Sequence, residues 1–307
     1  MRLAAVSVDL DEIPCYAAIH GLPSPPAHAA RAIYDKALPR LERLFESEGI
    51  PATFFAIGSD LDETNAARLA SLARAGHEIA NHSFGHRYDL TRLDRASIRR
   101  EIERGMDAIE RACGVRPEGF RAPGYTITDT VFEVLEELGV AYDSSVFPCP
   151  AYYAPKAAVI GALELLGRPS RSIVDDPRVL SAPADPYRVG RPYWRRGGGM
   201  LELPIGVTRL LRLPYIGTSV VLSGTKGARL LTRAIAGRPL VNLELHGIDL
   251  ADAREDGLEL LVPHQPDLRR SAASKEAALR AAIGSLRDAG YRFVTLREAA
   301  ARASGAP

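Results

Sequence analysis

The chain has 307 residues, 46% of them hydrophobic, and its 39 basic side chains nearly balance 38 acidic ones. This length suits a single large α/β domain, and the net charge of +1 does not indicate a nucleic-acid partner or an acidic membrane surface. No run of about 18 apolar residues is present, which excludes a membrane-spanning helix. Three cysteines without a C-x-x-C pair and no signal-peptide pattern lead us to expect a cytoplasmic protein; a homo-oligomer is compatible with the sequence.

The first predicted strand, residues 6–11, is an apolar run that ends in Asp9 and Asp11. Successive side chains of a strand alternate between its faces, so the two carboxylates point the same way. Buried carboxylates need a paired charge, a metal ion or a catalytic role, because an unpaired one is too costly. The alternative is that the strand has already ended and both acids are solvated or cap the next element. The second motif, described next, favours the metal.

That motif is the histidine pair His82 and His86, which follows a short predicted strand at residues 78–81. On a helical turn, residues i and i+4 lie on one face, where two imidazoles can bind the same metal ion. A four-residue spacing is weak evidence by itself, since a helix surface with two solvated histidines shows it too. Between the two motifs we expect a loop at 12–27 that borders the site, then a helix at 29–48, a strand and a helix.

Strands and helices continue to alternate as far as a strand at 140–143, as in parallel α/β proteins. Residues 147–200 interrupt this pattern with many prolines, arginines and aromatics, and we predict an irregular insertion there. Trp194 and Arg195 lie in its densest part and are predicted to bind substrate, since aromatic faces suit sugar rings and arginines suit anions. The alternative is a solvated loop packed on the barrel. Later strands bring the total to about seven, which predicts a barrel-like (β/α) domain spanning 1–307.

Four motifs resemble those of the polysaccharide deacetylase family, carbohydrate esterase family four. They are the acid pair, the run G-H-E-I-A-N-H-S-F-G-H at 76–86, R-A-P-G-Y at 121–125, and L-E-L-H at 243–246. The single residue between the acids is similar to the peptidoglycan-deacetylase and allantoinase-like branch. The resemblance covers about residues 3–298 with a divergent middle, and it implies a distorted seven-stranded (β/α) barrel of the polysaccharide deacetylase type.

The resemblance also implies roles for individual residues. A divalent metal, most simply zinc, with cobalt, nickel and iron as alternatives, would be held by Asp11, His82 and His86. Asp9 would be the general base and His246 the general acid. The remaining roles are Arg121 holding the base, the backbone N–H of Tyr125 as oxyanion donor, and a substrate-binding turn that contains Pro123 and Tyr125.

One family feature is missing, namely an Asp-Trp pair whose aspartate orients the acid histidine. Glu202 or Asp249 would have to replace it. The predicted function is a metal-dependent carbohydrate deacetylase, a hydrolase that removes an N-acetyl or similar acyl group from an amino sugar or glycan. The alternatives are an allantoinase-like hydrolase of a small amide or ureide, and a catalytically silent carbohydrate-binding module.

Overall fold

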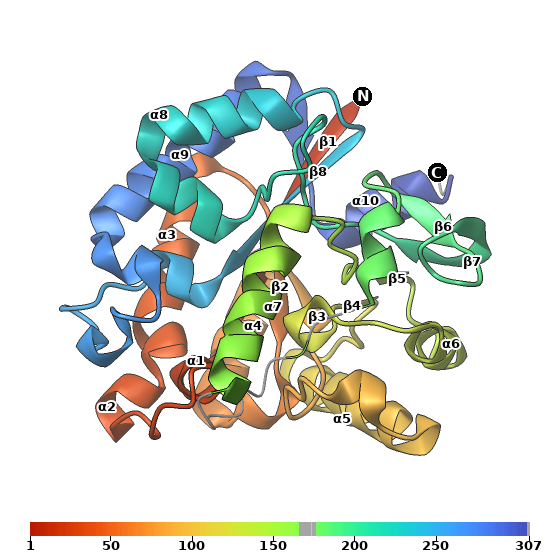
Figure 1. Cartoon of the computed structure of the whole chain (residues 1–307), viewed down its shortest axis with the longest axis horizontal. Coiled ribbons are helices and arrows are strands. Elements are labelled where there is room, and N and C mark those ends of the chain that lie inside the picture. Colours follow the sequence, from red (N-terminus) through yellow and green to blue (C-terminus); the bar gives the residue numbers. More distant parts are fainter. Residues whose placement is uncertain (166–172, 174–175, 306–307) are drawn as a thin grey trace.

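A computed structural model describes residues 1–165, 173 and 176–305 of the chain (Figure 1). One twisted sheet in the order β6-β7-β5-β4-β3-β2-β1-β8 runs through it, and β9 pairs with β1 beside this path. The pairings are parallel except for the β6–β7 hairpin. The strands are β1 (Arg2–Asp9), β2 (Thr53–Ala56), β3 (Glu78–Asn81), β4 (Gly119–Phe120), β5 (Tyr142–Asp143), β6 (Tyr187–Val189), β7 (Arg196–Glu202), β8 (Leu240–His246) and β9 (Tyr291–Phe293).

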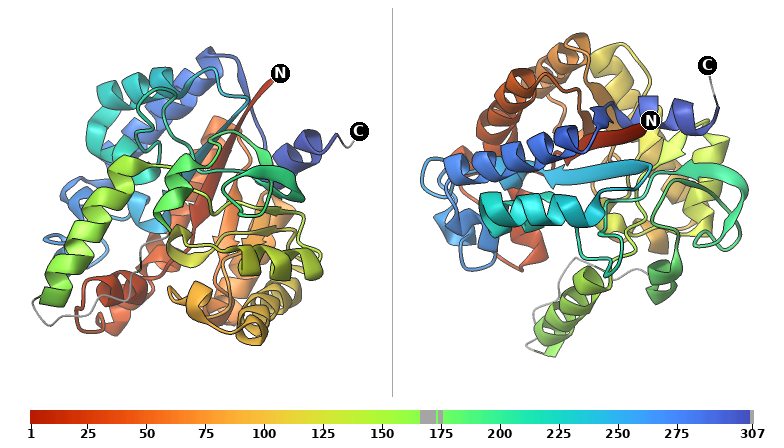
Figure 2. Two further views of the ribbon diagram at one scale, coloured as in Figure 1. Left: turned by 45° about the vertical axis from the view of Figure 1, so that its right-hand side comes forward. Right: turned by 90° about the horizontal axis from the view of Figure 1, so that it is seen from above.

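Helices surround the curled sheet, and α7 projects from the body of the molecule (Figure 2). They are α1 (Ile13–Ile19), α2 (Ala27–Ala30), α3 (Leu38–Glu48), α4 (Glu63–Arg74), α5 (Arg95–Cys113), α6 (Asp129–Glu137), α7 (Pro150–Leu165), α8 (Gly217–Ile235), α9 (Ala272–Asp288) and α10 (Leu296–Ala303). Side chains of β1 from Ala4 to Val8 have no exposed surface, so this strand is covered on both faces. This buried strand pairs with three others, β2, β8 and β9.

The barrel-like α/β fold is confirmed, but three details of the prediction are wrong. The described residues contain nine strands rather than about seven, and among them the three-residue strand β6 lies in a segment that was predicted to be irregular. The helix expected at 29–48 is divided into α2, a π-helical turn at Ile33–Ala37, and α3. The segment 147–200 is not irregular throughout, since it contains α7 and the β6–β7 hairpin.

Candidate metal centre and active site

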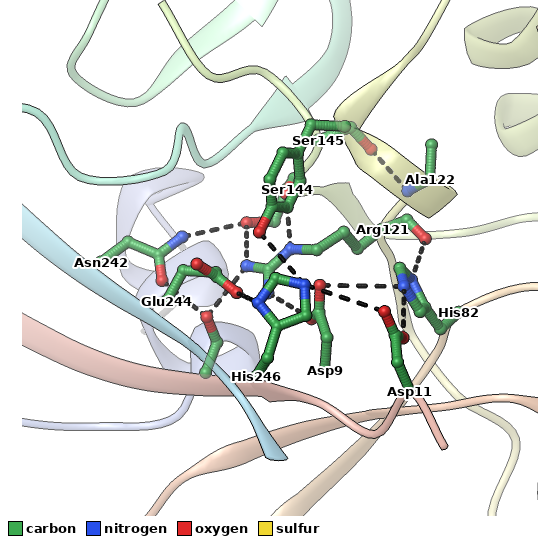
Figure 3. Close-up of polar contacts among 12 residues, drawn as sticks. Asp9, Asp11, His82, Arg121, Ala122, Ser144, Ser145, Asn242, Glu244 and His246 are labelled. Atoms are coloured by element: carbon green, nitrogen blue, oxygen red, sulfur yellow. Dashed lines mark hydrogen bonds and ion pairs between the residues drawn. The ribbon is translucent and has the colours of Figure 1, made fainter. Parts of the chain in front are cut away.

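The carboxyl ends of β1, β3 and β8 bring the predicted residues together. Asp9 ends β1 and lies directly opposite His246, the last residue of β8. Asp11 follows two residues later, and His82 follows β3. Parallel strands place their carboxyl ends at one edge of a sheet, which is where such folds bind ligands. Figure 3 shows these side chains converging from the three strands.

Asp11, His82 and His86 form a compact buried group whose ligand atoms lie within 4.8 Å of one another. Asp11 Oδ1 is 3.4 Å from His82 Nε2 and 3.2 Å from His86 Nε2. All three side chains are at least 95% buried. The sequence therefore identified three residues that the fold does bring to one point.

The loop that carries the two histidines is not the helical turn we expected. Ser83 and His86 have positive φ angles of 69° and 50°, which interrupt any helix. The His86 N–H donates to Ser83 Oγ at 3.0 Å, and the His82 and His86 ring centroids are 4.9 Å apart. A hydrogen-bonded loop, rather than helical periodicity, places the imidazoles side by side.

Hydrogen bonding around this group fits a divalent cation. His82 Nδ1 lies 2.7 Å from the Arg121 carbonyl oxygen, so Nδ1 carries a proton, and Nε2 on the other side of the ring faces Asp11. Asp11 Oδ1 and His86 Nε2 are buried without a hydrogen-bond partner. Burial alone would raise the pKa of Asp11, but the imidazoles of His86 and His82 outweigh it and lower that pKa well below its usual value. An ionised carboxylate with two imidazole nitrogens is a ligand set for zinc-like metals.

Asp9 has a different environment from Asp11. Its Oδ1 accepts a 2.6 Å hydrogen bond from Arg121 Nη1, and the guanidinium is fully buried. Arg121 also donates to Ser7 Oγ, Ser144 Oγ and the Ser144 carbonyl, so its position is held from three sides. Asp9 Oδ2 has no hydrogen-bond partner and lies 3.7 Å from His82 Nε2. One oxygen is therefore held in place while the other faces the centre.

His246 is oriented by a residue that the sequence analysis missed. Glu244 Oε1 lies 2.9 Å from His246 Nδ1, and Glu244 is fully buried. Burial lowers the pKa of His246, but the Glu244 carboxylate outweighs it and raises that pKa well above its usual value. The signal was present in the sequence, because residues two apart on a strand share a face and E-x-H places both side chains together.

Neither residue predicted to orient His246 contacts its ring. Asp249 Oδ2 accepts from the backbone N–H of His246 at 2.8 Å and so fixes the main chain. Glu202 lies across the sheet, opposite Asp143 in the β5–β7 register, and accepts from the Val146 N–H. The acid beside the His246 ring is instead Glu244, which lies two residues earlier on the same strand, β8.

Tyr125 is near the centre, but not through the atom we expected. The N–H of Tyr125 was the predicted oxyanion donor, but it already donates a hydrogen bond to the Ala122 carbonyl at 3.1 Å. Its hydroxyl instead lies 3.5 Å from His246 Nε2. Pro123 is buried and its carbonyl accepts from Thr126 Oγ1, so it shapes the turn while Gly124 and Tyr125 face the cleft.

A cleft opens over Asp11 and His246, with walls that are largely aromatic and aliphatic. Its polar positions include His20, His264 and Gln265, and the two imidazole rings stack at 5.1 Å. The segment that follows β1 borders the site as expected, because its Tyr16 and His20 line the cleft. The aromatic lining consists of Tyr16, Tyr88, Tyr125 and Tyr152.

Trp194 and Arg195 do not line this cleft. Trp194 packs against Tyr193, with ring centroids 5.1 Å apart, and the Arg178 guanidinium lies 4.5 Å above its ring. Arg195 is exposed, and its carbonyl accepts from the Gly190 N–H within the β6–β7 hairpin. The cluster of arginines and aromatics packs locally at the far edge of the sheet, and the predicted substrate contact is not supported by the lining of this cleft.

The fold and site define an α/β protein with a candidate divalent-metal centre at its strand ends. A family model described as polysaccharide deacetylase matches residues 32–142. A peptidoglycan deacetylase of Helicobacter pylori is 26% identical over 146 residues, which cover 47% of this chain and 49% of that protein. Residues 32–142 are therefore similar to the polysaccharide deacetylase family, and the chain spans only about half the length of that relative.

Solved structures agree on the fold. A family 4 acetyl xylan esterase from Clostridium thermocellum, in complex with a cobalt ion, is 18% identical with a TM-score of 0.51, covering 100% of this chain and 93% of that one. A CE4 family pseudoenzyme from Bacillus anthracis is 13% identical with the same TM-score, covering 97% and 64%. Since the second of these is described as a pseudoenzyme, the activity of this chain has to be argued from its own residues.

Proposed function

We propose that the protein is a metal-dependent hydrolase that removes an acetyl or similar acyl group from the nitrogen of an amino sugar. One observation carries the proposal: the candidate metal ligands, an acid held by a buried arginine and a carboxylate-paired histidine all meet at one point. The peptidoglycan deacetylase relative supports an amino-sugar substrate, and the tyrosine-lined cleft suits sugar rings. Zinc is the metal we propose, given two imidazoles and one carboxylate.

Each group then has a chemical task. The metal, held by Asp11, His82 and His86, would polarise the acyl carbonyl and make the attacking water more acidic. Asp9 takes the proton of that water at Oδ2, while Arg121 holds Oδ1 in place. Glu244, beside Nδ1, stabilises the protonated imidazole of His246. His246 Nε2 then gives its proton to the leaving nitrogen. The products are a carboxylic acid and a free amine.

The test is an activity screen on zinc-loaded protein with N-acetylated oligosaccharides, small ureides and amides as parallel substrates. We expect acetate release together with a new free amine on the sugar. Hydrolysis of the ureides alone would instead favour the allantoinase-like alternative. Stoichiometric zinc binding without turnover of any substrate would favour the silent carbohydrate-binding module.

A further inference from the structure

A long segment of this nearly neutral chain contains basic residues and lacks acidic ones. Residues 203–243 contain six cationic side chains and no aspartate or glutamate. The whole chain has 39 basic and 38 acidic residues, so the imbalance is local and the net charge conceals it. The segment comprises the loop after β7, the helix α8 and most of β8.

The loop carries two leucines into solvent on a hydrogen-bonded hairpin. Leu210 is 94% exposed and Leu211 is 73% exposed. The Thr208 N–H donates to the Leu213 carbonyl, and the Leu213 N–H donates to Thr208 Oγ1, each at 2.9 Å. Below them, Val207 and Pro214 form an antiparallel bridge. The leucines are therefore presented by an ordered turn, and an arginine flanks them on either side.

The second half of α8 carries the other cations. Ala228, Thr232 and Ile235 form its buried side, while Lys226, Leu230 and Arg233, spaced by four and three residues, face away from it. Leu230 is 62% exposed. The outer side of this half-helix thus repeats the combination of leucine and cations found on the hairpin.

The hairpin and this half of α8 are neighbours. The Arg209 N–H donates to the Ala234 carbonyl at 3.0 Å, which attaches the hairpin to the C-terminal end of the helix. Gly224, with φ of 63°, separates this half from the first turns of α8, which supply Thr218, Ser219 and Leu222 to the cleft. The first half of α8 borders the candidate active site, and the second half is basic and exposed.

The exposed cations of this segment lack acidic partners. No carboxylate of the described residues lies within 4.0 Å of the basic nitrogens of Arg209, Lys226, Arg229 or Arg233. Arg212 has no such carboxylate either, but it is half-buried and donates to the Leu180 carbonyl. The sixth cation, Arg238, is buried and paired with Asp185 at 2.8 Å. By contrast, many arginines elsewhere on the surface are paired, such as Arg95 with Glu133 and Glu137. The surface is complementary to an external anion-rich partner.

We propose that this Leu/Arg surface, formed by residues 209–213 and the exposed side of 226–233, docks the protein onto an anionic lipid bilayer. The leucines would enter the boundary between headgroups and acyl chains, and the cations would contact lipid phosphates. Nucleic acid fits less well, because the surface offers no aromatic side chain for base stacking, whereas exposed leucines suit a hydrocarbon boundary. Docking at a bilayer is independent of the chemistry proposed for the cleft.

Vesicle co-sedimentation tests this with the full-length protein. We expect binding to vesicles containing phosphatidylglycerol, at least tenfold weaker binding to pure phosphatidylcholine, and release as salt rises to about 0.5 M. Leu210→Glu with Leu211→Glu, and separately Arg229→Glu with Arg233→Glu, should each lower the binding at least about tenfold. None of these positions belongs to the cleft, so acyl hydrolysis of a soluble substrate should persist and show that the variants fold.

Matched controls are Leu260→Glu, a leucine that is 74% exposed on another loop, and Arg111→Glu on α5. Both should bind vesicles like the unmodified protein. Equal binding to the two lipid compositions would overturn the proposal, as would full binding by either double variant. It would also fail if the leucine variant kept its affinity while a soluble polyanion such as heparin displaced the protein from vesicles, because the partner would then be a polyanion and not a bilayer.

Discussion

Two pairs of buried carboxylates end strands of the same sheet, and their neighbours give them different properties. Asp9 and Asp11 follow β1 and are surrounded by Arg121, His82 and His86. Asp143 and Glu202 end β5 and β7 and lie opposite each other. The first pair faces cations and imidazoles, whereas the second pair faces mainly itself and backbone or serine donors.

The difference appears in the protonation of the two sites. The imidazoles hold the pKa of Asp11 well below its usual value despite burial. Burial and the neighbouring Asp143 raise the pKa of Glu202 well above its usual value, which favours the neutral form of this carboxyl. Asp143 accepts from the Ser145 N–H and hydroxyl, and Ser145 Oγ accepts from the Ala122 N–H beside Arg121. One acid pair can therefore bind a cation, and the other supports the loop that carries Arg121.

The largest effect should come from separating Asp9 from Asp11. Asp9→Asn removes the proton acceptor but keeps the shape, so kcat should fall about 10²–10⁴-fold while bound metal stays at the original stoichiometry. Asp11→Asn replaces an anionic ligand by a neutral amide, so metal affinity itself should fall. Metal content by elemental analysis and kcat, measured for both variants, check this. Loss of metal in the Asp9 variant with retention in the Asp11 variant would reverse the roles.

A smaller effect is expected from Glu244→Gln, which removes the charge beside His246 Nδ1. Turnover should fall about 10–100-fold, as for other residues that orient a functional histidine. Because Glu244 raises the pKa of His246, its loss should move the alkaline limb of the kcat/KM profile to lower pH. The Asp249→Asn variant is the matched control and should leave that limb in place. An unshifted limb in the Glu244 variant would contradict the assigned orientation.

The Glu202→Gln variant tests the Asp143–Glu202 pair through the pH dependence of the free energy of unfolding. The raised pKa means that folded protein holds a proton that unfolded chains release above about pH 4.5, so stability falls as pH rises past that value. The slope for one proton is about 1.4 kcal/mol per pH unit until the folded-state pKa is reached. The amide keeps the acceptor for the Val146 N–H and does not titrate. Denaturant unfolding at pH 4.5 and pH 8 should show a relative gain for the variant at the higher pH; parallel pH profiles would mean that Glu202 is ionised.

The smallest effect concerns the β6–β7 hairpin. Trp194→Ala with Arg195→Ala should change KM and kcat less than about twofold, because neither side chain lines the cleft. The variant also loses the contacts of the Trp194 ring with Arg178 and Tyr193, which lie outside the cleft. Tyr152→Ala provides the contrast, since this ring faces the cleft and its loss should raise KM severalfold. If the hairpin variant raised KM as much as the cleft variant, the hairpin would contact substrate after all.

Local patterns were sufficient for part of the candidate site. Asp9 and Asp11 were identified from alternation along the first strand, His82 and His86 from their four-residue spacing, and His246 from its resemblance to a family motif. Trp194 and Arg195 lie outside the cleft, and the sequence could not show this, because a cluster of arginines and aromatics looks the same whether it faces a ligand or packs on itself. Composition carries no information about which side of the sheet a hairpin joins.

By itself the sequence determined the alternation of strands and helices, the buried strand β1, and the residues available for chemistry, since these follow from periodicity and from residue type. Only the tertiary structure decided that Glu244 pairs with His246, that the Tyr125 N–H is engaged with Ala122, and that Glu202 lies opposite Asp143. The same is true of the Leu/Arg surface, whose residues the even overall charge concealed. The reason is physical: burial and the nearest charged neighbour set the state of an ionisable group, and both depend on segments far apart in the chain.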